Sequence, residues 1–190
     1  MNTSSDAQSS PQIRHQERRA EIIDAAIRAF ARKGFGGSTL ADIAVEAGVS
    51  QPRISQIFGS KQNAFIVAHR RAADYILGLL SENAQPPYSM KSFGAGMRQQ
   101  LNREPAMLMM LFQGLTDSYV PAIAEESRRV IQEIVELVDR AGGTPEDARI
   151  LLERGYFLYA MLSIGVLGHV DEHPSFSALL ESVSMRDVTS

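Results

Sequence analysis

The stretch Thr39–Phe58 reads TLADIAVEAGVSQPRISQIF and has the pattern of two short helices joined by a tight turn. Thr39 stands three residues before Asp42, which is the spacing of a capping box at the start of a helix. Gly48 stands where this helix must stop, because glycine takes the left-handed conformation of a helix end without strain. Ser50 can then cap the second helix.

The second helix has one apolar side and one polar side. Pro52 fits its first turn, where the backbone N–H groups have no partner within the helix. Ile54, Ile57 and Phe58 form the side that we expect to be buried. The pattern is that of a helix-turn-helix, whose second helix would enter the major groove of DNA. The polar side chains that are long enough to reach base edges are Gln51, Arg53, Ser55 and Gln56.

An ordinary helical hairpin without a role in nucleic-acid binding is the alternative for this segment. The small side chain of Ala44 lets two helices approach, and Gly48 turns the chain. Ile54 then fills the space between the helices. This tight steric pattern favours DNA binding over the plain hairpin.

The flanking residues extend the pattern on both sides. Upstream, Glu17–Lys33 reads ERRAEIIDAAIRAFARK, with apolar residues at helical spacing, and Gly34 ends this helix. Downstream, Ser60 can cap a new helix that Lys61 opens. The run RRAEIIDAAIRAFARKGFGGSTLADIAVEAGVSQPRISQIFGSKQNAF resembles the whole DNA-binding domain of the TetR family of transcriptional regulators.

The resemblance implies an all-α protein, in which an N-terminal three-helix helix-turn-helix domain precedes a larger C-terminal helical domain for effector binding and dimerisation. It implies a ligand-responsive repressor that a small apolar effector releases from a palindromic operator. The expected partners are double-stranded DNA, a second copy of the chain and the effector, with no cofactor, no metal and no membrane. The residues expected to contact DNA are Thr39, Gln51, Pro52, Arg53, Ser55, Gln56 and Lys61.

The recognition helix departs from the family in one respect. Most members carry two tyrosines late in this helix, whose hydroxyls typically contact phosphate, and the matching positions here are Ser55 and Ile57. Ser55 is shorter than tyrosine, and Ile57 cannot donate a hydrogen bond. Phosphate contacts are expected instead from Lys61, as a charge, and from Thr39, as a hydroxyl near a helix N-terminus.

The distribution of charge supports a division into two domains. The net charge is −3, but the balance within residues 1–61 is positive and that of the remaining residues is negative. Basic charge is therefore biased toward the end that would face DNA. We expect residues 1–14 to form a disordered arm, residues 15–60 the DNA-binding domain, and residues 61–190 the helical effector-binding and dimerisation domain.

The residues that the chain lacks exclude several kinds of chemistry. There is no cysteine, so disulfides, thiolate catalysis and cysteine-ligated zinc are excluded. The sequence also has no pattern typical of a Ser/His/Asp catalytic triad, and we do not expect an enzyme. A small helical enzyme with an apolar active site and a DNA-binding protein without sequence preference are the alternatives. The longest nearly apolar run, Gly155–Gly168, is too short to cross a bilayer, which favours the cytoplasm.

The rest of the chain has helical patterns that are separated by breaks. Pro86 and Pro87 interrupt the first pattern, because proline cannot continue a helix. Thr144 can cap a helix with Pro145 in its first position and acidic residues where the helix dipole favours them. The helices expected are Ser60–Asn83, Ser89–Leu101, Glu104–Asp117, Pro121–Ala141, Thr144 to about Gly168, and Pro174–Val183.

Apolar side chains, several of them methionines, gather in the expected helices between residues 89 and 119. Methionine adapts to irregular apolar surfaces, so the cluster suits a ligand cavity as well as a plain core. For each residue taken singly a plain core is favoured, whereas the resemblance favours a cavity for the cluster as a whole. The residues expected to line this cavity are Phe93, Met97, Leu101, Met107, Met110, Leu111 and Tyr119.

From Gly155 onward the chain is apolar on nearly every side of the expected helix, so every side must be covered. One side can pack on the core of its own subunit, and the other side needs a partner. We expect a two-fold symmetric four-helix bundle built from this helix and the last helix of each subunit. The expected contact residues are Leu152, Gly155, Tyr159, Leu162, Val166, Phe176 and Leu180.

The segment His169–His173, HVDEH, has the composition of a metal site. Pro174 follows it, and no helix holds the two histidines with regular geometry, so a solvated loop is favoured. His15 and His69 have no partner in the sequence, and we expect His69 to be packed or solvated.

Overall fold

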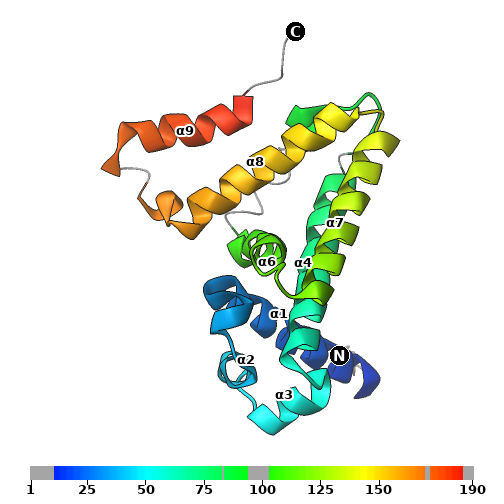
Figure 1. Cartoon of the computed structure of the whole chain (residues 1–190), viewed down its shortest axis with the longest axis vertical. Helices are drawn as coiled ribbons and strands as arrows, with labels where there is room; N and C mark the ends of the chain where they lie inside the picture. The colour runs from blue at the N-terminus through cyan, green and yellow to red at the C-terminus, as the bar shows by residue number, and fades with distance from the viewer. Residues whose placement is uncertain (1–10, 83, 94–102, 170–171, 186–190) are drawn as a thin grey trace, which may run out of the picture.

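The computed structural model describes residues 11–82, 84–93, 103–169 and 172–185, and no strand occurs among them (Figure 1). A short 3₁₀-helix, η1, covers Val166–Gly168. The α-helices are α1 (Pro11–Gly37), α2 (Leu40–Ala47), α3 (Gln51–Phe58), α4 (Lys61–Ser81), α6 (Pro105–Thr116), α7 (Pro121–Arg140), α8 (Pro145–Ser163) and α9 (Pro174–Met185).

Helices α1, α2 and α3 pack together at one end of the molecule (Figure 1). The Thr39 hydroxyl accepts the Asp42 backbone N–H while the Asp42 carboxylate accepts that of Thr39, so the predicted capping box is confirmed. Gly48 ends α2 in the left-handed conformation with φ 62°. Ser50 has the extended backbone of a helix cap, but its side chain makes no capping hydrogen bond, so this detail of the prediction was wrong.

Helix α1 is longer than the sequence pattern predicted. It begins at Pro11, so residues 11–14, which were expected in a disordered arm, are helical. Residues 1–10 of that arm lie outside the described part of the chain. The predicted stop at Gly34 is confirmed, because this glycine has a non-helical backbone with φ 66° inside the range assigned to α1.

Helix α4 leads from the three N-terminal helices into a bundle with α6 and α7 (Figure 1). Its start is as predicted, with the Ser60 hydroxyl accepting the backbone N–H of Asn63 at 3.1 Å. Of the helix expected over Ser89–Leu101, residues 90–93 are helical, and residues 94–101 lie outside the described part. No helix among the described residues is long and apolar enough to span a membrane.

Helix α8 begins at the predicted capping box of Thr144 and Asp147. It ends at Ser163 rather than near Gly168, because Gly165 adopts a left-handed conformation with φ 74° and the chain turns into η1. Helix α9 follows and extends back along the far end of the molecule (Figure 1).

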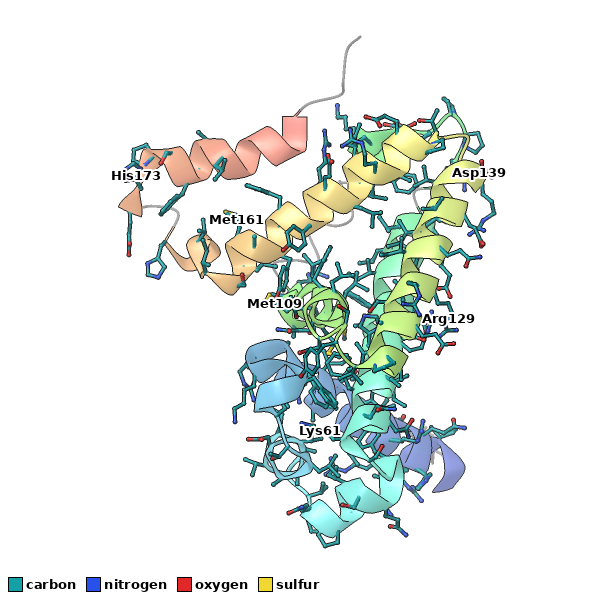
Figure 2. The ribbon with its side chains drawn as sticks, in the orientation of Figure 1. Lys61, Met109, Arg129, Asp139, Met161 and His173 are labelled. Atoms are coloured by element: carbon teal, nitrogen blue, oxygen red, sulfur yellow. The ribbon has the colours of Figure 1, made fainter. Side chains whose placement is uncertain are left out.

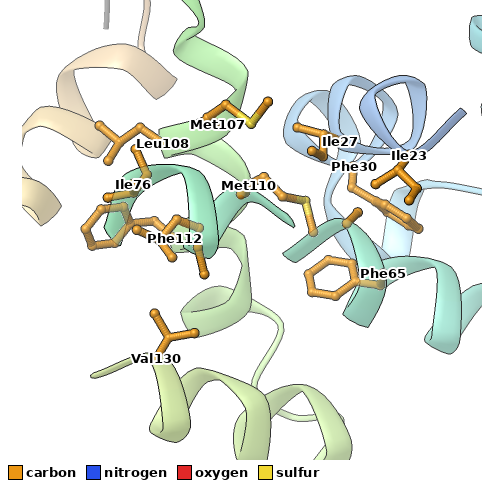
Figure 3. Close-up of a cluster of buried hydrophobic side chains, with 14 of the residues drawn as sticks. Ile23, Ile27, Phe30, Phe65, Ile76, Met107, Leu108, Met110, Phe112 and Val130 are labelled. Atoms are coloured by element: carbon orange, nitrogen blue, oxygen red, sulfur yellow. The ribbon is translucent and has the colours of Figure 1, made fainter. Parts of the chain in front are cut away.

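A single buried cluster runs from the DNA-binding domain through α4 and α6 into α7. Phe65 of α4 contacts Phe30 of α1 edge to face, with ring centroids 5.0 Å apart. Met110 of α6 is completely buried and points toward these two rings (Figure 3). The two domains therefore share one continuous core rather than meeting across a solvated boundary.

Gly114 of α6 gives a test of how closely α4, α6 and α7 pack. A Cβ at this position would lie 2.3 Å from His69 Nε2 and 2.5 Å from Ser127 Oγ. Gly114→Ala should therefore lower the free energy of unfolding by about 1–3 kcal/mol through overpacking. Urea unfolding of the purified chain measures this change.

Gly78 of α4 is the matched control, because a Cβ there meets no atom within 4 Å. Gly78→Ala should leave stability unchanged or raise it by up to about 1 kcal/mol through helix propensity. Equal effects of the two substitutions would contradict the close approach at Gly114.

Candidate DNA-binding face and ligand cavity

Helix α3 is held by one side and presents the other to solvent. Ile54 and Phe58 are buried against the core of the three N-terminal helices. Ser55 is half-buried. Arg53 donates a hydrogen bond to the Gln56 side chain at 2.8 Å, one helical turn along the exposed surface. The predicted DNA-contact residues that are exposed are Thr39, Gln51, Pro52, Arg53 and Gln56.

Helix α2 is fixed to α1 by ion pairs that cross between them. Arg28 and Arg32 of α1 both donate to the Glu46 carboxylate, and the hydrogen bond from Arg32 is the main reason why the pKa of Glu46 is lowered. Lys33 pairs with Asp42, and its hydrogen bond is the largest cause of the lowered pKa of that carboxyl. These contacts fix the angle at which α3 is presented.

The two side chains predicted to contact phosphate already have partners within the protein. The Thr39 hydroxyl donates to Asp42 at 2.6 Å. The Lys61 ammonium donates to the Phe35 carbonyl at 2.9 Å and lies 4.2 Å from the centre of the Phe35 ring. Figure 2 labels Lys61 where α4 begins, beside the N-terminal helices. Lys61 thus positions the end of α1, and a phosphate contact from its remaining N–H groups stays a prediction.

A cavity of about 530 Å³ lies between α4, α6, α7 and α8. Its walls are almost entirely apolar, with two polar side chains, His69 of α4 and Ser127 of α7, and one carboxylate, Glu153 of α8. Such a concave apolar space with a few polar groups is typical of a small-molecule site. The apolar and aromatic lining residues are Leu111, Phe112, Leu115, Val130, Ile131, Ile134, Leu152, Tyr156, Phe157 and Ala160.

Most residues predicted to line a cavity do not line this one. Leu111 does. Phe93, Met107 and Met110 are buried in the core cluster instead. Tyr119, which follows the end of α6, is 67% exposed and is not among the residues that line this cavity. The predicted positions Met97 and Leu101 lie outside the described residues.

Sequence reasoning missed the contributions of α4, α7 and α8 to this cavity. His69 was expected to be merely packed or solvated, and it is buried in the cavity wall. The only sequence signal for its position was a histidine among the small apolar residues of α4. On α8, one apolar side was expected to pack on the core of its own subunit, and part of that surface lines this cavity instead.

Several residues predicted at the dimer interface contact their own subunit. Gly155 lies against Phe112, since a Cβ there would be 2.9 Å from Phe112 Cζ. Tyr159 stacks on the same ring with centroids 5.4 Å apart. Leu152 lines the cavity, and Val166 is buried. The apolar pattern could not show which side of α8 faces α6.

The other predicted interface residues are less enclosed. Leu162 is partly buried and packs on the core cluster. Phe176 of α9 is half-buried, and the side chain of Leu180 lies outside the described part. Ala148 is the only buried residue of α8, and Leu179 of α9 is 41% exposed. Much of the apolar surface of α8 and α9 is therefore incompletely covered by this chain.

The histidines after α8 have partners of their own. His169 Nδ1 lies 2.6 Å from the Glu172 carboxylate, and His173 Nδ1 lies 2.6 Å from the Ser175 hydroxyl. Within the described ranges, no three potential ligands come together in a way that could hold a metal ion.

Comparison with known proteins finds a family model that matches the N-terminal helices. Residues 22–66 match the family model of bacterial regulatory proteins of the tetR family. This match covers most of α1, all of α2 and α3, and the first turn of α4. No curated protein matches the chain closely enough to count as a relative.

Solved structures share the fold along nearly the whole chain. A TetR-like transcriptional regulator from Rhodococcus sp. RHA1 is 20% identical, with a TM-score of 0.61 over 88% of this chain and 93% of that chain. The multidrug binding protein EbrR, solved with imidazole, is 19% identical, with a TM-score of 0.57 over 99% and 100%. The fatty acid degradation regulator FadR from Bacillus halodurans is 16% identical, with a TM-score of 0.61 over 93% and 94%.

Arg53 is expected to read a base, most simply guanine through its O6 and N7 atoms. Arg53→Ala should weaken specific binding by about 1–3 kcal/mol and relax the preference at one position of each half-site. Titrations against single-base variants of a selected DNA site measure this. Arg140→Ala, at the distant end of α7, is the control. Equal weakening on every sequence would assign Arg53 to phosphate.

His69 predicts a dependence of stability on pH. Burial lowers its pKa below the ordinary value of 6.5, against the opposing effects of its hydrogen bond to Leu111 and the charge of Glu126. At a pH just below 6.5, His69 is therefore protonated more readily in the unfolded chain than in the folded chain. The free energy of unfolding should fall as the pH drops below about 6.5.

His69→Phe should remove this part of the pH dependence. Urea unfolding of both proteins at about pH 7.5 and about pH 5.5 measures the difference. The charged neighbours Arg70, Glu126 and Arg129, which also influence the pKa of His69, are the same in both proteins. If both proteins lost the same free energy of unfolding between these two pH values, the pKa of His69 would not differ between the folded and unfolded chains.

Proposed function

We propose that this TetR family transcriptional regulator is a repressor that a small, largely apolar molecule releases from a palindromic operator. Helices α1–α3 bind DNA through the exposed side of α3, and the cavity between α4, α6, α7 and α8 binds the effector. The effector shifts the population toward a dimer whose recognition helices are wrongly spaced for the operator. This shift requires that the effector binds that state more tightly than the DNA-bound state.

The observation that carries the proposal is that α6 contacts both the cavity and the DNA-binding domain. Leu111, Phe112 and Leu115 of α6 line the cavity. Two residues after Leu115, at the end of α6, the buried carboxylate of Asp117 accepts a hydrogen bond at 2.7 Å from the backbone N–H of Phe35 in α1. A molecule that displaces α6 would therefore act on the helix that carries α2 and α3.

The incompletely covered surface of α8 and α9 supports a dimer. In addition to Leu179 of α9, Tyr156 of α8 is 53% exposed and Ile164 after α8 is 70% exposed. Large exposed apolar patches mark surfaces that bind other proteins. In a two-fold dimer, the recognition helices would meet successive major grooves about 34–36 Å apart, or at a somewhat wider spacing.

Selection of DNA sites from a random pool tests the DNA-binding part of the proposal. The full-length chain is expected to enrich a palindrome, because a two-fold dimer presents two identical recognition helices. Enrichment of a single unrepeated site would contradict the symmetric dimer. Enrichment of no sequence would favour a DNA-binding protein without sequence preference. Transcription from a promoter that contains the selected site should fall when the protein is added.

Two neighbouring substitutions on α8 test where the dimer forms. Leu162 packs partly on the core of its own subunit, whereas Met161 is not among the side chains that pack there. Leu162→Glu should give a monomer or an aggregating chain without operator binding. Met161→Glu should give a folded monomer with weakened operator binding, since two-fold symmetry places the new charge twice in one interface.

Sedimentation measures the oligomeric state, and circular dichroism shows whether each variant is folded. An intact Met161→Glu dimer with full affinity for DNA would place the interface elsewhere.

A further inference from the structure

The cavity has one polar corner, which is formed by helices that are far apart in the sequence. His69 of α4 and Ser127 of α7 both line the cavity, and both are buried. Gly114 of α6 lies between them, since a Cβ there would come within 2.5 Å of atoms on both side chains. The remaining lining residues from α6 and α7 are apolar. Among the described lining residues, this corner is therefore the one buried place for a polar group of a ligand.

The hydrogen bonding of His69 fixes which of its nitrogens carries the proton. Nε2 lies 3.0 Å from the backbone carbonyl of Leu111, and a carbonyl can only accept a hydrogen bond. Nε2 must therefore carry a proton. Burial lowers the pKa of His69, so the ring is neutral at neutral pH. The other nitrogen, Nδ1, is then a bare acceptor.

Nδ1 of His69 is buried and has no hydrogen-bond partner. Buried polar atoms in folded proteins are nearly always paired, and an exception is often explained by a bound group. Phe65, which stacks on the ring at 6.1 Å, cannot supply a hydrogen bond. The imidazole therefore carries an unused, buried acceptor on a residue that lines a largely apolar cavity.

Ser127 offers the same kind of group. Its hydroxyl donates at 2.9 Å to the Ile123 carbonyl one turn back in α7, so its proton is already used. The lone pairs of its oxygen are left as acceptors. Both polar side chains of the corner thus favour a ligand that donates a hydrogen bond.

The charges around the cavity disfavour an anion. Within the described part of the chain, Glu153 is the only charged side chain that lines it, and Arg149 pairs with that carboxylate on the exposed side of α8. Arg70, next to His69, is held by Glu126 and Glu133. Among the described residues, no lysine or arginine lines the cavity to neutralise a carboxylate or a phosphate.

We propose that the cavity selects a neutral, apolar molecule with one hydrogen-bond donor, such as a phenol or an alcohol, and that His69 Nδ1 accepts this hydrogen bond. The inference rests on the proposed function, in which the cavity is the effector site. It adds the chemical class of the effector and excludes carboxylates of the same size.

Three probes of one shape test the proposal: para-butylphenol, para-butylanisole and para-butylbenzoate. Calorimetric titration of the full-length protein at neutral pH gives their affinities. The phenol should bind at least about tenfold more tightly than the ether and the benzoate, because only the phenol is a neutral donor. Equal affinity of phenol and ether, or tighter binding of the benzoate, would contradict the selection of a neutral donor. Either result would still support the cavity as a site for small molecules.

Two variants separate His69 from the rest of the cavity. In His69→Phe, the preference for the phenol over the ether should fall to less than about twofold, because the acceptor is lost while the ring shape is kept. Ile131→Val, in the apolar wall, should weaken all three probes alike and keep the preference. An unchanged preference in His69→Phe would overturn the role of His69.

A measurement on the unaltered protein does not depend on how the variants fold. In protein with ¹⁵N-labelled histidine, the phenol should move the resonance of the unprotonated His69 nitrogen upfield, as expected when a lone pair accepts a hydrogen bond. The ether should leave it in place. Binding of the phenol without this shift would overturn the contact. Binding of none of the three probes would reject the effector cavity, and the inference with it.

Discussion

The backbone of Phe35 is the point through which the two halves of the molecule hold each other. Gly34, just before Phe35, turns the chain with φ 66° inside the range of α1. Asp117 of α6 accepts the N–H at 2.7 Å, and Lys61 of α4 donates to the carbonyl at 2.9 Å. The ring packs edge to face on Phe65, with centroids 5.6 Å apart. The orientation of α1 therefore depends on α4 and α6 together.

The same two helices also enclose the cavity, so the proposed effector site and the three N-terminal helices share their structural elements. Helix α4 is tied to α7 by Arg70, which donates to Glu126 and Glu133, directly beside the cavity residues His69 and Ser127. Figure 2 shows Arg129 of α7, which also donates to Glu126, on the outer side of the bundle. A ligand that changes the spacing of α4, α6 and α7 must work against this network and against the Phe35 contacts.

Local signals predicted the local structure well, whereas contacts between distant helices could not be predicted from the sequence. The capping box of Thr39 and Asp42 depends on residues three apart, and it is confirmed. The end of α8 was missed because an apolar run does not show that Gly165 turns the chain. Met110 was expected to line a cavity, but it is buried in the core cluster, whereas His69 lines the cavity. The sequence could not show this, because the packing of α4 on α6 decides which side chain faces the cavity.

Coupling between the cavity and DNA is the central claim, and linkage makes it directly measurable. If an effector lowers the affinity for the operator, the operator must lower the affinity for the effector by the same factor. Calorimetric titration of para-butylphenol into the free protein and into the protein saturated with its selected operator compares the two affinities. Coupling predicts weaker binding of the phenol to the operator complex than to the free protein. Equal affinity in the two titrations would contradict it.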